Sequence, residues 1–240
     1  MTSTAQWVSE PFGAVEVLER LPGTGRVLDL GCGSGRLTAA LADRGWQAAG
    51  VDTSEAQLRR ARARSELVDW RLGDMDEPLD WPEETFDAVV SRCALMIARD
   101  PAATLREARR VLRPGGRVVT AVWATPDRNL WFAGPRAAVA DALGAERAAF
   151  ARHFGRLGSE QELEQVHTDA GFERVEVAVV ADIVPFTSAA DHWSALCSQI
   201  GHFRRLDAKL TADERERVLF ALAERLHPPV GRTQLIAVGE

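Results

Sequence analysis

The sequence lacks the features of secreted, disulfide-bonded or membrane-spanning proteins. Its three cysteines, Cys32, Cys93 and Cys197, are far apart and form no CxxC pair, so they offer neither a disulfide framework nor a metal site. No uninterrupted apolar run approaches the roughly 18 residues that a membrane span requires. The start, MTSTAQWVSE, is polar and acidic, whereas a secretory signal is basic and then apolar. We therefore expect a cytoplasmic protein with no metal and no membrane partner.

Clustered basic charge is also scarce. The net charge is −6, and Lys209 is the only lysine among 29 basic residues. Binding to phosphate backbones requires clustered Lys and Arg, so we expect no nucleic-acid partner. The run RRARAR (59–64) is interpreted as a solvated helix face. The chain has no internal repeat and no low-complexity linker, which favours a single domain over residues 1–240 and leaves a homodimer open.

The first half of the chain alternates between strand and helix patterns. Strands are expected at Arg26–Leu30, Gln47–Val51, Val68–Leu72, Phe86–Ser91 and Arg117–Trp123. Helices are expected from Leu37 to Arg44, from a Ser54/Gln57 capping box to Arg64, and from Asp100 to a stop at Pro114-Gly115-Gly116. This alternation is typical of parallel βαβ units with right-handed crossovers. It predicts an α/β fold with a doubly wound, mostly parallel, Rossmann-like sheet.

After Trp123 the alternation stops. Residues 124–160 and 188–227 have helical patterns rich in aromatics, and we expect them to form two helical cap inserts. A helix over Glu160–Ala170 and late strands over Val175–Val184 and Thr233–Val238 flank the second insert.

The stretch VLDLGCGSGRL (27–37) joins the first strand to its helix through three glycines. Ligands of open parallel sheets bind beyond the carboxyl ends of the strands, and glycines allow a close approach. The helix start favours a carboxylate or phosphate. Asp52 ends the second strand, where its carboxylate could accept both hydroxyls of a ribose. A dinucleotide fingerprint, GxGxxG, would need glycine at Arg36, so a ribose-bearing ligand is indicated but not identified.

Several segments together resemble the class I S-adenosylmethionine-dependent methyltransferases. They are VLDLGCGSG (27–35), GVDTS (50–54), RLGDMDEPLDWPEETFDAVVS (71–91) and LREARRVLRPGGRVVTAVW (105–123). The resemblance covers residues 13–123 as a cofactor-binding core, and it implies S-adenosyl-L-methionine as the cofactor. It also implies seven strands, of which the last runs antiparallel, as the late strands allow.

The resemblance implies roles for residues that follow the first four strands. The methionine portion of the cofactor would lie near Asp29, Gly31, Cys32, Gly33 and Gly35. The ribose would contact Asp52 and Thr53, and the adenine Asp74 and Met75. Ser91, Arg92 and Cys93 would face its reactive end. For Asp74, a solvated acidic loop is the alternative interpretation.

The activity implied is methyl transfer to the O, N or C atom of a small, fairly apolar molecule, in secondary metabolism or a quinone pathway. The two cap inserts, 124–160 and 188–227, would bind this acceptor. Trp123, Trp131 and Trp193, with Cys93, are candidates for the acceptor pocket, and His153 and His202 are candidate bases.

Other activities stay open. The same fold could support a cyclase or a purely binding protein, or the ligand could be a nicotinamide cofactor of an oxidoreductase. A nucleic-acid base methyltransferase is disfavoured, because SRCA (91–94) stands where a [DNS]-PP-[YFW] segment is expected. Catechol-type, metal-dependent transfer lacks a convincing set of ligands near Asp100.

Overall fold

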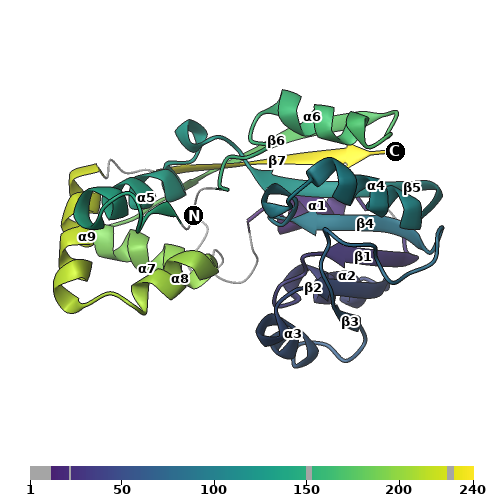
Figure 1. Ribbon diagram of the computed structural model, residues 1–240, viewed down its shortest axis with the longest axis horizontal. Helices are drawn as coiled ribbons and strands as arrows, with labels where there is room; N and C mark the ends of the chain where they lie inside the picture. Colours follow the sequence, from purple (N-terminus) through teal and green to yellow (C-terminus); the bar gives the residue numbers. More distant parts are fainter. Residues whose placement is uncertain (1–11, 22, 150–152, 226–229) are drawn as a thin grey trace. The chain divides into compact units, whose positions relative to one another are not determined.

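The computed structural model describes residues 12–21, 23–149, 153–225 and 230–240 (Figure 1). They form a seven-stranded sheet in the order β3-β2-β1-β4-β5-β7-β6, mostly parallel with antiparallel last strands. This arrangement confirms the predicted doubly wound, Rossmann-like α/β fold.

The strands lie close to their expected positions. They are β1 (Arg26–Leu30), β2 (Gln47–Asp52), β3 (Asp69–Leu72), β4 (Phe86–Arg92), β5 (Leu112–Trp123), β6 (Val175–Val184) and β7 (Val230–Gly239). The helices are α1 (Ala14–Glu19), α2 (Arg36–Asp43), α3 (Glu55–Arg62), α4 (Pro101–Val111), α5 (Leu130–Leu143), α6 (Glu160–Asp169), α7 (Ala189–Gln199), α8 (Gly201–Asp207) and α9 (Ala212–Arg225). Short 3₁₀ turns, η2 (Leu95–Ile97) and η3 (Pro126–Arg128), follow β4 and β5.

The start of β5 differs from the sequence prediction. Pro114-Gly115-Gly116 was expected only to end the preceding helix, yet β5 already begins at Leu112, which pairs with Phe86. A register shift between Phe86 and Ala88 absorbs the extra residues. The proline and glycines therefore form an irregular first part of the strand, as a bulge permits.

The core of the sheet is apolar on both faces, because parallel strands of this fold are covered by helices. Val27 and Leu28 of β1 are fully buried and point to opposite faces. On one face, Val27 and Val90 pack in a cluster with Val17 of α1 and Leu41 of α2. Each such side chain stabilises the fold by about 1.5–3 kcal/mol on burial.

Polar caps define where the helices begin. Asp100 accepts a hydrogen bond from the Ala103 amide at 3.0 Å, directly before Pro101, as expected. Ser54 accepts from the Gln57 amide at 3.4 Å, which is the serine half of the expected capping box.

A buried histidine joins α6 to β5. His167 Nδ1 lies 2.7 Å from the carbonyl oxygen of Leu163, and a carbonyl can only accept. Nδ1 therefore carries the proton, and Nε2 accepts from the Thr120 hydroxyl at 3.1 Å. Burial lowers the pKa of His167 to about 4, so the imidazole is neutral in the folded chain.

This histidine makes stability depend on pH. Between pH 6.5 and 4 the unfolded chain binds a proton at His167 that the folded chain excludes, so stability falls as the pH falls. We expect the loss of unfolding free energy due to His167 to reach about 2–3 kcal/mol near pH 4. Urea unfolding of His167→Gln should show lower stability at pH 7 and a shallower loss towards pH 4.5. An equally steep loss in the variant and the natural chain would contradict this assignment.

The chain divides into two compact units. Unit 1 comprises residues 1–122, 157–180 and 234–240, and unit 2 comprises 123–156 and 181–233. The expected cap inserts, 124–160 and 188–227, fall mostly within the ranges of unit 2; that the chain acts as a single domain stays a prediction. In the described part of the chain, no helix has the length and apolar character to cross a membrane.

Candidate functional site

The glycine loop forms at the carboxyl end of β1, in unit 1. Gly31, Gly33 and Gly35 have φ angles of 71°, 55° and 74°, in the left-handed region that glycine adopts without strain. The amides of Gly31 and Cys32 both donate to the carbonyl oxygen of Val51, at 2.9 and 3.0 Å. The loop is thereby fixed against β2, and Gly35 is the N-cap residue directly before α2.

The three glycines are needed for different reasons. A Cβ at Gly31 would lie 2.3 Å from the Cβ of Ala94, and one at Gly35 would lie 2.4 Å from the Trp70 ring. A Cβ at Gly33 would meet, among the described residues, only Gln57 Nε2, at 3.7 Å. Gly31 and Gly35 therefore make room for the protein's own side chains. Gly33 is the glycine with open space where a ligand can approach.

Asp52 lies next to this open glycine. Its Oδ2 accepts from the Gly33 amide and its Oδ1 from the Ser54 amide, each at 2.8 Å. A carboxylate oxygen has two acceptor positions, so each retains one. The half-buried carboxylate is therefore held in a fixed orientation and can accept two vicinal hydroxyls, as a ribose presents. Thr53 beside it is exposed. These residues fit an adenosyl ligand.

Asp29 and Cys32 have buried side chains. Asp29 Oδ2 accepts from the Thr38 hydroxyl at 2.7 Å, which ties β1 to α2, and burial raises the pKa of Asp29 to about 6. Cys32 Sγ would lie 3.0 Å from a Cβ at Gly50, and burial raises the pKa of this thiol. Cys32 thus contributes its backbone to the loop, and cofactor contacts of both residues stay predictions.

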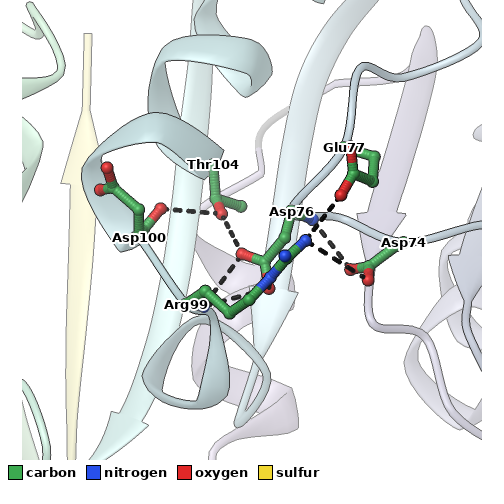
Figure 2. Close-up of polar contacts among 6 residues, drawn as sticks. All are labelled: Asp74, Asp76, Glu77, Arg99, Asp100 and Thr104. Atoms are coloured by element: carbon green, nitrogen blue, oxygen red, sulfur yellow. Dashed lines mark hydrogen bonds and ion pairs between the residues drawn. The ribbon is translucent and has the colours of Figure 1, made fainter.

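Asp74 and Met75 begin the loop between β3 and β4. Met75 Sδ would lie 3.8 Å from a Cβ at Gly31, so the structure brings this loop to the glycine loop. Asp74 is half-buried, and its Oδ1 accepts from the Asp76 amide at 3.0 Å. Figure 2 shows a residue that sequence reasoning missed: Arg99, whose Nη2 lies 3.9 Å from Asp74 Oδ2.

Ser91 and Arg92 end β4 and make internal contacts. Ser91 is buried, and its hydroxyl donates to the carbonyl oxygen of Leu30 at 3.1 Å. Arg92 donates from Nη1 to the carbonyl oxygen of Phe12 at 3.2 Å. Ser91 therefore joins β4 to β1, and Arg92 fixes the chain just before α1. Their expected contact with the reactive end of the cofactor stays a prediction.

Cys93 adopts an unusual backbone conformation for a residue other than glycine. Its φ is 58°, and its amide donates to the carbonyl oxygen of Ala121 at 2.7 Å. Gln234 of β7 donates from Nε2 to Cys93 Sγ at 3.1 Å. The buried Oε1 of Gln234 has no hydrogen-bond partner among the described residues. Burial raises the pKa of Cys93, so its sulfur is a neutral thiol. Such strain is characteristic of functional sites.

The three candidate tryptophans of the acceptor pocket are buried in unit 2. Trp131 stacks with His192 at 5.3 Å between ring centres, and Trp193 donates to Asp207 Oδ1 at 2.7 Å. Trp123 packs edge-on against Phe132 at 5.8 Å. All three have packing partners in unit 2, and their role towards an acceptor stays a prediction.

The two candidate bases are near one another in unit 2. Burial, Arg205 and His153 all lower the pKa of His202, so the two histidines are close enough to interact. Both are half-buried. His192, in contrast, is fully buried; its Nε2 donates to the carbonyl oxygen of Trp131 at 2.7 Å, and burial lowers its pKa to about 4.

One further hollow and the possible metal ligands of the described residues can be compared with the glycine loop as candidate sites. Within the described residues, no group of three His, Cys, Asp or Glu side chains could hold a metal ion. A hollow of about 660 Å³ lies at the amino ends of β4 and β5, lined by residues such as Arg109, Gly115 and Gly171. Ligands of parallel sheets bind at the opposite, carboxyl ends, where the glycine loop lies.

Comparison with known proteins gives a consistent result. Residues 28–120 match the family model described as a methyltransferase domain. The chain is 36% identical over 125 residues to a ubiquinone biosynthesis O-methyltransferase of Alkalilimnicola ehrlichii, covering 50% of this chain and 47% of that protein. It is also 36% identical over 159 residues to a phosphatidylethanolamine N-methyltransferase of Cereibacter sphaeroides, and this match covers 63% of this chain and 72% of that protein. The chain spans about half the length of the ubiquinone biosynthesis O-methyltransferases it matches.

The fold resembles that of phosphoethanolamine N-methyltransferase 2 of Haemonchus contortus, solved with S-adenosyl-L-methionine. The TM-score is 0.62 at 20% identity, over 95% of this chain and 52% of that one. The shared fold, the matched domain and the long match to the Cereibacter protein agree with the geometry of the glycine loop and Asp52. The chain belongs to the class I S-adenosylmethionine-dependent methyltransferases.

Proposed function

We propose that this chain transfers the methyl group of S-adenosyl-L-methionine to a small, fairly apolar molecule. The observation that carries the proposal is Asp52, held by two backbone amides beside Gly33, the glycine whose Cβ side is open. When bound, the cofactor's sulfonium supplies an electrophilic methyl group. The chain's own task is to bind the adenosyl group and to align an acceptor, since alignment and exclusion of water provide much of the acceleration.

The proposed cofactor contacts follow the strand ends of unit 1. Asp52 accepts the two ribose hydroxyls, with Thr53 beside it. The loop over Asp29–Gly35 surrounds the methionine portion, and Asp74 and Met75 contact the adenine. Ser91, Arg92 and Cys93 form the wall near the reacting sulfur.

On the acceptor side, an O, N or C atom attacks the methyl carbon in line with the breaking S–C bond. The electron pair of that bond would stay with the cofactor's sulfur, and an acidic acceptor would give its proton to a base. We propose His153 or His202 as this base, and Trp123, Trp131 and Trp193 as apolar groups for the acceptor. The names of the relatives include both an O- and an N-methyltransferase, so the acceptor atom is left open.

The histidine proposal predicts a specific loss. One of the two variants, His153→Gln or His202→Gln, should retain the affinity for S-adenosylhomocysteine and lose turnover, because only proton removal is affected. The variant of the other histidine, which should turn over like the natural chain, is the matched control. If both variants turn over like the natural chain, neither histidine is the base.

Label transfer tests the function itself. The protein is incubated with methyl-tritiated cofactor and a panel of phenols, amines and carboxylic acids, and labelled product is counted. Transfer to one class of acceptor supports the proposal. Cofactor binding without transfer to any of them would favour a non-methylating role, and a melting temperature raised by NADH alone would favour an oxidoreductase. A cytoplasmic location, a role in secondary metabolism and a homodimer are part of this proposal.

A further inference from the structure

We propose that Asp76 and Arg99 are positioning residues that set the selectivity of the cofactor site for the 6-amino group of adenine. They act by fastening the loop that carries Asp74 and Met75 to the first turn of α4. The inference rests on the proposed function, which assigns the adenine to Asp74.

Asp76 is the centre of a polar network in unit 1 (Figure 2). Both of its carboxylate oxygens lie 3.0 Å from the backbone amide nitrogen of Arg99, and Oδ2 also accepts from Arg99 Nε at 3.3 Å. Its side chain is only 11% exposed, whereas that of Arg99 is 68% exposed. A carboxylate this buried is costly unless donors surround it, so the contacts of Asp76 fix the loop in one position.

The other side of the network is the start of α4. The hydroxyl of Thr104 lies 3.2 Å from Asp76 Oδ1 and 3.1 Å from the carbonyl oxygen of Asp100, and Thr104 is itself buried. Asp100 caps the same helix through the Ala103 amide. Asp76 is therefore attached to a rigid element, and its position follows that of α4.

Asp76 in turn orients Asp74. The Asp76 amide donates to Asp74 Oδ1 at 3.0 Å, which occupies that oxygen. Asp74 Oδ2 has the longer contact of 3.9 Å with Arg99 Nη2, whose shorter partner is Glu77 at 2.7 Å. Oδ2 is thus the oxygen of Asp74 that can accept a hydrogen bond from an exocyclic amine. Its direction depends on Asp76 and Arg99.

The exposure of the side chains indicates which contacts of this network hold the loop in position. The pair of Arg99 with Glu77 joins side chains that are 68% and 62% exposed, and such surface pairs contribute little. Asp76 is enclosed and bound by several donors. The expected order of effect is therefore Asp76 first, Arg99 second and Glu77 last, which makes Glu77→Gln a matched control within the same loop.

Calorimetry with two ligands tests the proposal. One is S-adenosylhomocysteine, and the other is its analogue with hydrogen in place of the 6-amino group. We expect the natural chain to prefer the amino ligand by about tenfold or more, as for a hydrogen bond to a charged group. Asp76→Asn should reduce this preference at least about threefold with little change for the analogue. Glu77→Gln should keep the preference.

The outcomes separate the possibilities. If Asp76→Asn retains the preference for the amino ligand, or weakens the binding of both ligands equally, the proposed positioning role is wrong. If Asp74→Ala keeps the preference, or the natural chain binds neither ligand, the proposed adenine site itself is wrong. If Asp76→Asn does not fold, Arg99→Met takes its place, because it removes the guanidinium and leaves the backbone amide. A reduced ratio of the two ligand affinities in Arg99→Met then supports the positioning role, and an unchanged ratio contradicts it.

Discussion

Asp52→Ala should weaken the binding of S-adenosylhomocysteine more than tenfold. The variant removes a carboxylate whose two free acceptor positions would accept the ribose hydroxyls, and loss of a hydrogen bond to a charged group costs about 1.5–3 kcal/mol. It also leaves the Gly33 and Ser54 amides without their acceptor, which loosens the loop at the point where the ligand binds. Isothermal titration calorimetry measures the effect directly.

Two further variants show whether the loss comes from the ribose contact. Asp43→Asn changes an exposed aspartate of α2 and should leave the affinity unchanged. Asp52→Asn keeps one oxygen acceptor, so its affinity for S-adenosylhomocysteine should lie between those of the alanine variant and the natural chain. An unchanged affinity in Asp52→Ala, with the melting temperature also unchanged, contradicts the assignment of the ribose to this residue.

Alanine at Gly35 should cost more stability than alanine at Gly33, whereas alanine at Gly33 should cost more cofactor affinity. At Gly35 the new Cβ would lie 2.4 Å from the Trp70 ring at φ 74°, so strain and overpacking together should lower the free energy of unfolding by about 2–4 kcal/mol. At Gly33 the described residues leave room, so only the backbone strain of about 1–2 kcal/mol is expected.

For cofactor affinity, Gly33→Ala should have the larger effect of the two variants. The Cβ at Gly33 would occupy the space into which the ligand must come, and an overpacking cost of about 1–3 kcal/mol corresponds to a roughly five- to 150-fold loss of affinity. Unfolding in urea and calorimetry with S-adenosylhomocysteine give the two quantities for each variant. If Gly33→Ala binds like the natural chain, the open side of this glycine is not where the ligand lies.

The strands and the glycine loop could be predicted because their signals are local. The pattern VLDLGCGSG encodes a buried strand, a left-handed turn and a helix start within a few residues, and the structure has all three. The sequence did not distinguish the three glycines, however. Their roles depend on Ala94 and Trp70, which come from other parts of the chain.

Contacts over long separations in the chain could not be predicted. Gln234 meets Cys93 across 141 positions, and nothing near either residue indicates the pairing. The acidic run around Asp74 was visible in the sequence, but not that the Asp76 side chain would be only 11% exposed and bonded to Arg99 and Thr104. For the candidate tryptophans, composition alone could not show that each has a packing partner inside unit 2.

The central claim is that the adenosyl group binds where β1 passes into α2, with its sugar on Asp52. A crystal structure of the protein grown with S-adenosylhomocysteine measures this directly. We expect both ribose hydroxyls within about 2.5–3.2 Å of the Asp52 carboxylate, a range typical of hydrogen bonds, and the homocysteine chain against Gly33. Clear density for the ligand at any other place, with the space beside Gly33 filled by side chains, would contradict it.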